Sequence, residues 1–207
     1  MIDVVTWGTA HLYGDALAQQ HRLRHRLFVE RNGWQVPSHD GMEYDQFDTP
    51  AAVYLVRRDN AGLVGGVARL IPTNRPYMLK ELWPEMLEGE VPVTPLVWEA
   101  TRFGIEDTLE PAAKRRIATE IVIGCLEYGM MLGIERYLVL MPPLIIRRTI
   151  GGAGCEVRFL GQSRELAAYP VAAAEIRVSP EALAAARARA GIDHAVIRHN
   201  AITKEAA

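Results

Sequence analysis

Two carboxylates and an arginine–aromatic pair stand close together in the first quarter of the chain. Asp45 and Asp48 lie three residues apart, and their burial would require cationic partners because an unpaired buried charge is very costly. Arg24 and Phe28 lie four residues apart, a spacing that puts both on one face of a helix. Residues of these types would form a pocket for a charged ligand that carries a ring.

A second group with the same chemistry follows in an apolar context. Arg69 lies in one strand-like run, and Glu99, Thr101 and Arg102 lie between the aromatic residues of another. Strict alternation along a strand puts Glu99 and Arg102 on opposite faces, so both reach one pocket only through a bulge or an ion-pair cluster at the strand edge. Taken alone, Glu99 and Arg102 favour a structural salt bridge.

The elements that must position these residues alternate between helix and strand. The apolar periodicity and the turn residues predict a first helix ending at Gly33, strands at 53–58 and 63–71, a short helix near 79–86, a strand at 97–104, a helix at 111–133, a strand at 137–141, a helix through 146–150, strands near 156–160 and 173–178, and a helix at 180–191. This order predicts a single α/β domain over residues 1–193, a three-layer sandwich around a mixed sheet. Residues 194–207 are expected to form a disordered tail.

Composition limits the classes of function. The chain has 207 residues, of which 49% are hydrophobic, and its net charge of −2 gives no case for nucleic acid or an anionic membrane as a partner. No apolar run approaches the ~20 residues that span a bilayer. Two cysteines without paired spacing and an N-terminus without a secretion signal predict a cytoplasmic, reduced protein. A monomer is the default expectation.

Eight separated positions agree in identity and order with one family: Arg24, Phe28, Trp34, Asp45, Asp48, Arg69, Glu99 and Arg102. With these residues the chain resembles the acyl-homoserine-lactone synthases, the autoinducer synthases of quorum-sensing bacteria, from about the first helix to Gly161. The resemblance implies an architecture similar to that of the N-acetyltransferases. In that architecture two adjacent central strands, here 97–104 and 137–141, splay apart and admit an acyl chain.

The resemblance also implies a reaction. S-adenosyl-L-methionine is condensed with an acyl group carried by acyl carrier protein or coenzyme A, through amide formation and lactonisation, and methylthioadenosine is released. S-adenosyl-L-methionine is then a substrate, and no cofactor is expected. By resemblance, the S-adenosylmethionine pocket includes Arg24, Phe28 and Trp34, and the catalytic electrostatic cluster beside it includes Asp45, Asp48, Arg69, Glu99 and Arg102. Glu99 is expected to accept the amine proton through water.

Five substrate-binding candidates remain, and the last three of them concern the acyl chain. They are Thr101, Phe103, Leu140, Met141 and Ile146, although the last three would serve equally as ordinary core. Leu140 lies where members that favour 3-oxo chains carry a threonine. A keto group without that hydroxyl would enter unpaired, at a cost of about 1–3 kcal/mol. We therefore expect an acyl chain that is unsubstituted at carbon three.

Two features bear on the donor and on metals. The segment 104–111 is acidic and poor in glycine, unlike the turn of backbone amides that binds pyrophosphate in acetyltransferases. The pairs Arg115–Arg116 and Arg147–Arg148 either dock an acidic carrier protein or are solvated helix surface. His21 and His25 have the spacing of a helical metal pair without a third ligand, so solvated surface is expected and no metal is predicted.

Two alternative functions lie in other classes. An N-acyltransferase of the acetyltransferase fold, acting on a different amine, would share the acyl gap but would not need the residues at 24–48. A non-enzymatic sensor of S-adenosylmethionine would keep the pocket and release no methylthioadenosine.

Overall fold

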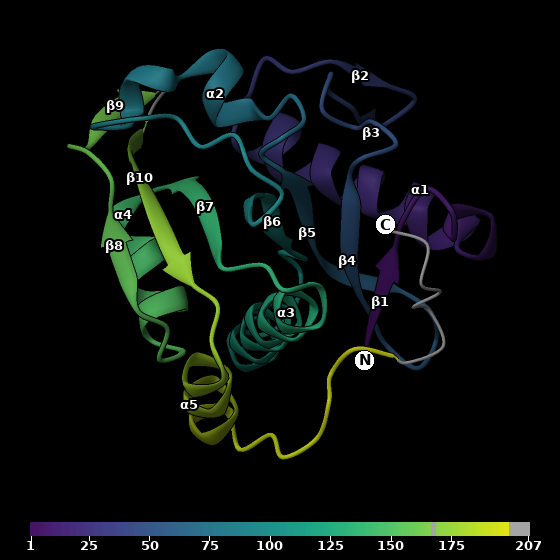
Figure 1. Ribbon diagram of the computed structural model, residues 1–207. Helices are drawn as coiled ribbons and strands as arrows, with labels where there is room; N and C mark the ends of the chain where they lie inside the picture. The colour runs from purple at the N-terminus through teal and green to yellow at the C-terminus, as the bar shows by residue number, and fades with distance from the viewer. Residues whose placement is uncertain (167–168, 199–207) are drawn as a thin grey trace.

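The computed structural model describes residues 1–166 and 169–198. A sheet forms its centre (Figure 1), in the order β1-β4-β5-β6-β7-β10-β8, with β9 paired to β10. The strands are β1 (Ile2–Val5), β4 (Val53–Arg58), β5 (Val64–Pro72), β6 (Val97–Ile105), β7 (Arg136–Met141), β8 (Val157–Phe159), β9 (Arg164–Leu166) and β10 (Tyr169–Arg177). Among the named strands of residues 1–166 and 169–198, only β6 and β7 pair in parallel. The predicted mixed sheet is therefore confirmed.

Helices cover both faces of the sheet. One face carries α1 (Gly14–Arg24), its continuation η2 (His25–Arg31), α2 (Met78–Leu82) and the turn η3 (Pro84–Met86). The other carries α3 (Pro111–Leu132), α4 (Pro143–Ile145), η4 (Ile146–Gly151) and α5 (Pro180–Ala190). A small hairpin of β2 (Ser38–His39) and β3 (Met42–Glu43) lies beside α1, and η1 (Ala10–Leu12) precedes it. These layers confirm the predicted three-layer sandwich.

Helix α3 is the long element that the sequence predicts at 111–133. It begins at Pro111, where a missing N–H is harmless, and ends at Gly133, whose φ of 70° is the left-handed conformation that glycine adopts easily. Gly66 lets α3 approach β5 closely, because a Cβ on Gly66 would lie 2.7 Å from Ile117 Cγ2 and 2.8 Å from Ile121 Cδ1. The central sheet and α3 thus pack as one unit.

The parallel pair at the centre of the sheet separates along its length. Pairing between β6 and β7 covers Val97 with Arg136, Trp98 with Tyr137, and Glu99 with Leu138. Both strands continue beyond Glu99 and Leu138, but there they no longer pair with each other. The predicted splay between these two strands is present, and it opens immediately after Glu99.

The start of the predicted disordered tail is ordered in the structure. Val196 and Ile197 are buried, and the Val196 carbonyl oxygen accepts a hydrogen bond of 2.8 Å from the Ile2 amide. Their own amides donate to the Glu127 carboxylate at 3.0 Å. The domain boundary predicted after residue 193 is therefore wrong for 194–198, because this segment covers the edge of β1. Residues 199–207 lie outside the described part of the chain.

Candidate active site

The first helix presents Arg24 and Phe28 on its inner side, as predicted. After η2 the chain turns at Gly33, which has a φ of 68°, and the Trp34 amide donates to the Phe28 carbonyl oxygen at 2.8 Å. This turn folds the Trp34 ring back onto Phe28. The two ring centroids lie 4.8 Å apart with an interplanar angle of 13°, so the helix end builds a stacked aromatic surface.

The segment after β3 carries the carboxylates. The Asp45 amide donates to Asp48 Oδ2 at 2.8 Å, and the Phe47 amide donates to Asp45 Oδ1 at 2.8 Å. These bonds hold the loop in a tight turn with both side chains directed at α1 and β5. The spacing of three that the sequence shows is therefore the spacing of a turn.

A bulge in β6 brings Arg102 to the same side as Glu99 and Thr101. Thr101 is opposite Arg69 and Gly104 is opposite Val67, so two residues of β6 face Ala68 alone. Arg102 itself has a φ of 51°, a conformation that costs a non-glycine residue about 1–2 kcal/mol. The bulge, one of the two solutions that the alternation argument allowed, is present, and the ion pairs of Arg102 offset its cost.

Three arginines and three carboxylates form one buried cluster. Arg24 Nε donates to Glu43 at 2.5 Å, and its two Nη atoms donate to Asp48 at 2.8 Å. Arg69 Nη1 contacts Asp45 at 2.6 Å and Asp48 at 3.0 Å. Arg102 Nη2 contacts Glu43 at 2.9 Å and Asp45 at 2.5 Å. We call these six residues the ionic cluster: Arg24, Glu43, Asp45, Asp48, Arg69 and Arg102.

Charge balance explains how the ionic cluster tolerates burial. Burial raises the pKa of the Asp45 and Asp48 carboxyl groups, but hydrogen bonds from Arg69 and Arg24 outweigh it and hold both pKa values below their usual range. Burial likewise works against the charge of Arg24, and its carboxylate partners raise its pKa instead. Arg24, Arg69, Asp45 and Asp48 are therefore all shifted toward their charged forms, and the ionic cluster pairs three arginines with three carboxylates.

Glu43 is the member of the ionic cluster that is missing from the sequence prediction. Its side chain is fully buried and joins Arg24 to Arg102. The available signal was its position two residues before Asp45, which in an extended segment puts both side chains on the same side.

The suggested salt bridge between Glu99 and Arg102 is wrong. The Glu99 carboxylate instead accepts hydrogen bonds from the backbone amides of Met78 at 3.0 Å and Leu79 at 2.7 Å. It therefore holds the first turn of α2. Burial raises the pKa of Glu99 to about 7, although these two amides and the nearby arginines act in the opposite direction. A carboxyl group with this pKa is suited to accept a proton near neutral pH.

Arg102 is the member of the ionic cluster that contacts the stacked rings of Phe28 and Trp34. Its guanidinium carbon lies 5.6 Å from the Phe28 ring centroid and 5.7 Å from that of Trp34. Its Nη1 atom contacts only a weak acceptor, Met78 Sδ at 3.5 Å. An anionic group of a ligand would displace this thioether contact most easily, while a ring would lie against the half-buried Trp34.

His21 is not solvated, contrary to the sequence expectation. It is 4% exposed, its Nδ1 lies 2.8 Å from the Glu43 carbonyl oxygen, and its ring stacks on Tyr44 with centroids 4.0 Å apart. Burial lowers its pKa to about 4, so the ring is neutral at physiological pH. Its contact with the Glu43 backbone ties β3 to α1.

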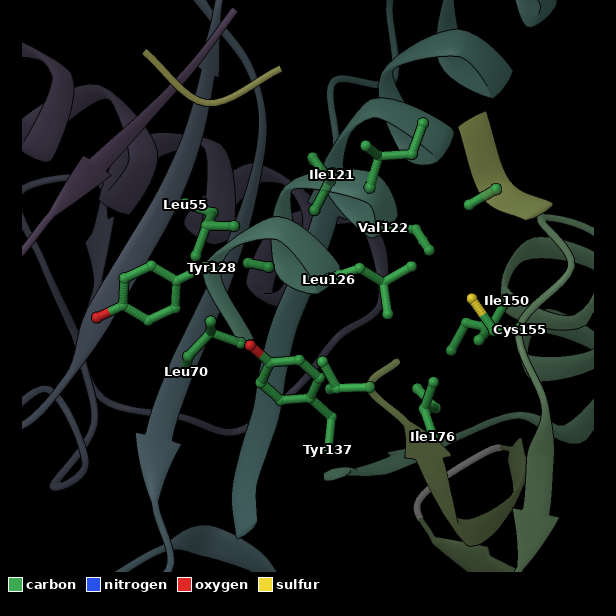
Figure 2. Packing of buried hydrophobic residues seen from close by; sticks show 14 of the residues in the cluster. Leu55, Leu70, Ile121, Val122, Leu126, Tyr128, Tyr137, Ile150, Cys155 and Ile176 are labelled. Carbon is green, nitrogen blue, oxygen red and sulfur yellow. The ribbon is translucent and has the colours of Figure 1, made fainter. Parts of the chain in front are cut away.

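A small apolar cavity of about 40 Å³ lies on the α3 side of the splay. Figure 2 shows part of its wall, where Val122, Leu126, Ile150 and Cys155 come together. Its lining consists of Ala68, Ala100, Thr101, Phe103, Val122, Cys125, Leu126, Tyr137, Val139, Met141, Ile150, Cys155 and Ile176.

The structure separates these five substrate-binding candidates. Thr101, Phe103 and Met141 line the cavity. Leu140 points to the other face of β7 and packs against the cluster that contains Leu138 and Ala173. Ile146 is fully buried in the core beside α3. Strand alternation explains why Leu140 and Met141 diverge, and contact of any of the five with substrate stays a prediction.

The described part of the chain contains neither a cluster of metal ligands nor a membrane-spanning helix. Among residues 1–166 and 169–198, no group of three or more His, Cys, Asp or Glu side chains is placed to hold a metal ion. Within the same residues, no helix combines the length and the apolar character needed to cross a bilayer.

Comparison with known proteins identifies the family. The family model described as autoinducer synthase matches residues 9–185. An acyl-homoserine-lactone synthase from Acinetobacter nosocomialis is 30% identical over 161 residues, which cover 75% of this chain and 88% of that protein. The solved structure of a CoA-dependent acyl-homoserine lactone synthase, BjaI, with SAM and isopentyl-CoA is 28% identical with a TM-score of 0.87, covering 96% of this chain and 92% of that one.

A more distant structure supports the architecture alone. FeeM, an N-acyl amino acid synthase from uncultured soil microbes, is 15% identical with a TM-score of 0.58, over 86% of this chain and 91% of that one. The predicted acyltransferase-type fold is thus confirmed. On the family match and these relatives, the chain belongs to the autoinducer synthases, which are acyl-homoserine-lactone synthases.

Proposed function

We propose that this enzyme makes an N-acyl-L-homoserine lactone from S-adenosyl-L-methionine and an acyl thioester, and releases methylthioadenosine. The observation that carries the proposal is the position of Glu99 and Arg102. Both belong to β6, and the splay that leads to the apolar cavity opens directly after Glu99. An amine donor held at the ionic cluster would therefore meet an acyl group held in the cavity.

The first step is attack by the amine. The methionine nitrogen forms a bond to the thioester carbonyl carbon, the bond from that carbon to sulfur breaks, and the sulfur leaves as a thiolate. Glu99 is the proposed acceptor of the amine proton, because its raised pKa of about 7 matches the operating pH. Since its carboxylate is only 1% exposed, we propose that the proton travels through a water molecule.

The second step closes the ring. The substrate carboxylate attacks its own γ-carbon, the bond from this carbon to the sulfonium sulfur breaks, and methylthioadenosine leaves. We propose that Arg102 orients the carboxylate through Nη1, because this atom has a weak protein partner, the Met78 thioether. The stacked rings of Phe28 and Trp34 would lie against the adenine. Arg24 and Arg69 already have carboxylate partners, and the ionic cluster that they form holds Arg102 in place.

The lining of the cavity favours an acyl chain without a polar substituent. Its two hydroxyl groups have partners, since Thr101 Oγ1 accepts from Arg69 Nε at 3.1 Å and the Tyr137 hydroxyl donates to the Cys125 carbonyl oxygen at 2.8 Å. We therefore propose chains unsubstituted at carbon three. Turnover of hexanoyl and 3-oxohexanoyl donors by the wild type tests this, and a native preference for the keto donor would contradict it.

Release of methylthioadenosine tests the reaction itself. Purified enzyme with S-adenosyl-L-methionine and an acyl thioester should release methylthioadenosine and the free thiol in equal amounts. Thiol release without methylthioadenosine would instead indicate an N-acyltransferase that forms an amide and does not close the lactone. Binding of S-adenosyl-L-methionine with no product from any acyl donor would indicate a sensor.

A further inference from the structure

A second hollow lies outside the site described above, between α1, the β4–β5 hairpin and the start of α3. It shares no lining residue with the acyl cavity and has a volume of about 640 Å³. Four arginines from four elements line it: Arg22 of α1, Arg26 of η2, Arg57 of β4, and Arg116 of α3. Neither the ionic cluster nor the proposed reaction uses them.

The charge of this hollow is positive. Arg26 contacts Glu106 at 2.5 Å, and Arg57 and Arg116 share the Glu120 carboxylate at 2.9 Å each. Within residues 1–166 and 169–198, no carboxylate lies in ion-pair contact with Arg22. The other lining carboxylate, Asp59, accepts hydrogen bonds from the amides of its own turn. Four guanidinium groups thus face three carboxylates, and an added anion would improve the balance.

The hollow lies at a distance from the splay that a long donor can span. Glu106 lines the hollow and Thr101 lines the acyl cavity, and five residues of strand extend over roughly 16 Å. Helix α3 passes both sites, with Ile117 at the hollow and Val122 at the cavity, a separation of about 7.5 Å along the helix axis. A thioester at the splay could therefore extend its other end to the arginines.

The loop before α3 is unlike the turn of backbone amides that binds pyrophosphate in acetyltransferases. It contains Glu106, Asp107 and Glu110, and the Glu106 side chain itself accepts from the Thr108 amide. Carboxylates at this position repel phosphate, and because Glu106 is itself part of the hollow, a phosphorylated donor would depend on the four arginines that line the hollow with it. We propose that the arginine-lined hollow binds the phosphate-bearing end of acyl-coenzyme A, which makes a coenzyme A thioester the acyl donor. This inference rests on the proposed function.

The test compares donors with and without phosphates. Arg22→Gln combined with Arg116→Gln should raise the KM for hexanoyl-CoA about tenfold, and leave kcat/KM for S-hexanoyl-pantetheine unchanged because that donor lacks phosphate. Arg147→Gln combined with Arg148→Gln is the matched control, since it removes two exposed arginines beyond the acyl cavity, and it should change neither value. An unchanged KM for hexanoyl-CoA in the first variant, or equal loss with both donors, would overturn the proposal.

A binding measurement separates this inference from the proposed reaction. Adenosine 3′,5′-bisphosphate should bind wild-type enzyme in isothermal titration calorimetry, and the double variant should bind it about tenfold more weakly, whether or not any lactone forms. Absence of binding to the wild type would overturn the site while leaving the synthase reaction intact. The proposal would also be overturned if the double variant lost activity only with hexanoyl carrier protein as the donor.

Discussion

Replacing Glu43 with glutamine should damage both the stability and the substrate affinity of the enzyme. Glu43 is fully buried and accepts from Arg24 at 2.5 Å and from Arg102 at 2.9 Å. The neutral amide leaves three buried arginines against two carboxylates, and its NH₂ group cannot accept from either arginine. Breaking a buried ion pair in this way costs about 3–5 kcal/mol.

The two expected effects have different sizes and different measurements. For a chain of this length, each kcal/mol shifts the Tm by about 2–4 °C, so Glu43→Gln should lower it by roughly 10 °C. Arg102 loses one charge-assisted hydrogen bond, worth about 1.5–3 kcal/mol, so kcat/KM for S-adenosyl-L-methionine should fall roughly 10- to 100-fold. Calorimetry measures the first effect, and methylthioadenosine release below the Tm of the variant measures the second.

Glu175→Gln is the control for Glu43→Gln. Glu175 also pairs with two arginines, Arg136 at 3.4 Å and Arg158 at 2.8 Å, but these partners are 40% and 65% exposed. Exposed pairs contribute about 0–1 kcal/mol, so the Tm should fall by no more than about 4 °C and the kinetics should not change. A Glu43→Gln enzyme with the Tm of the Glu175→Gln control and wild-type kcat/KM would refute the assigned role of Glu43.

Three further predictions address other parts of the site. Wild-type kcat/KM should rise with pH through about 7, because Glu99 must lose its proton to act as a base. Glu99→Gln should lose this pH-dependent rise and about 100-fold or more of kcat. A Glu99→Gln enzyme whose pH–rate profile keeps the rise would contradict the assignment. His21 has a pKa near 6.5 in the unfolded state and about 4 in the folded state, so the unfolded state binds the proton first as the pH is lowered. The free energy of unfolding from urea titrations should therefore fall by roughly 3 kcal/mol as the pH is lowered from 6.5 to 4. An equal fall in His21→Phe would exclude this cause. Ala100→Leu narrows the acyl cavity and should shift the products toward shorter acyl chains, as seen by mass spectrometry of the lactones; an unchanged chain distribution would show that the acyl group does not enter this cavity.

The long elements were predictable because their signals are local. Pro111 and Gly133 mark the two ends of α3, and Ser179 caps α5 by accepting from the Ala182 amide at 3.1 Å. The elements missing from the prediction are β1, β9 and the β2–β3 hairpin, which are two to four residues long. Runs this short have no measurable periodicity, and they form because a neighbouring strand or α1 covers them.

The site was predictable in its members but not in its connections. Seven of the eight resemblance positions lie in or against the ionic cluster, and Glu99 lies beside it on β6. Their pairing depends on a bulge with a φ of 51° at Arg102, which no residue type in the sequence indicates. The partners of Glu99 are backbone amides of α2, and contacts with the backbone leave no trace in residue identity. Burial of His21 likewise follows from the β2–β3 hairpin, which the sequence did not reveal.

Lactone production is the most direct test of the central claim. Extracts of cells that express the wild-type chain should contain an acyl-homoserine lactone by mass spectrometry, and cells that express Glu99→Ala or Arg102→Ala at equal soluble levels should contain little or none. The mass of the product would also report the acyl chain and its substitution at carbon three. Lactone formed equally by the wild type and by both variants would contradict the roles of Glu99 and Arg102. No lactone from folded wild-type enzyme supplied with S-adenosyl-L-methionine and acyl thioesters in vitro would contradict the proposed reaction.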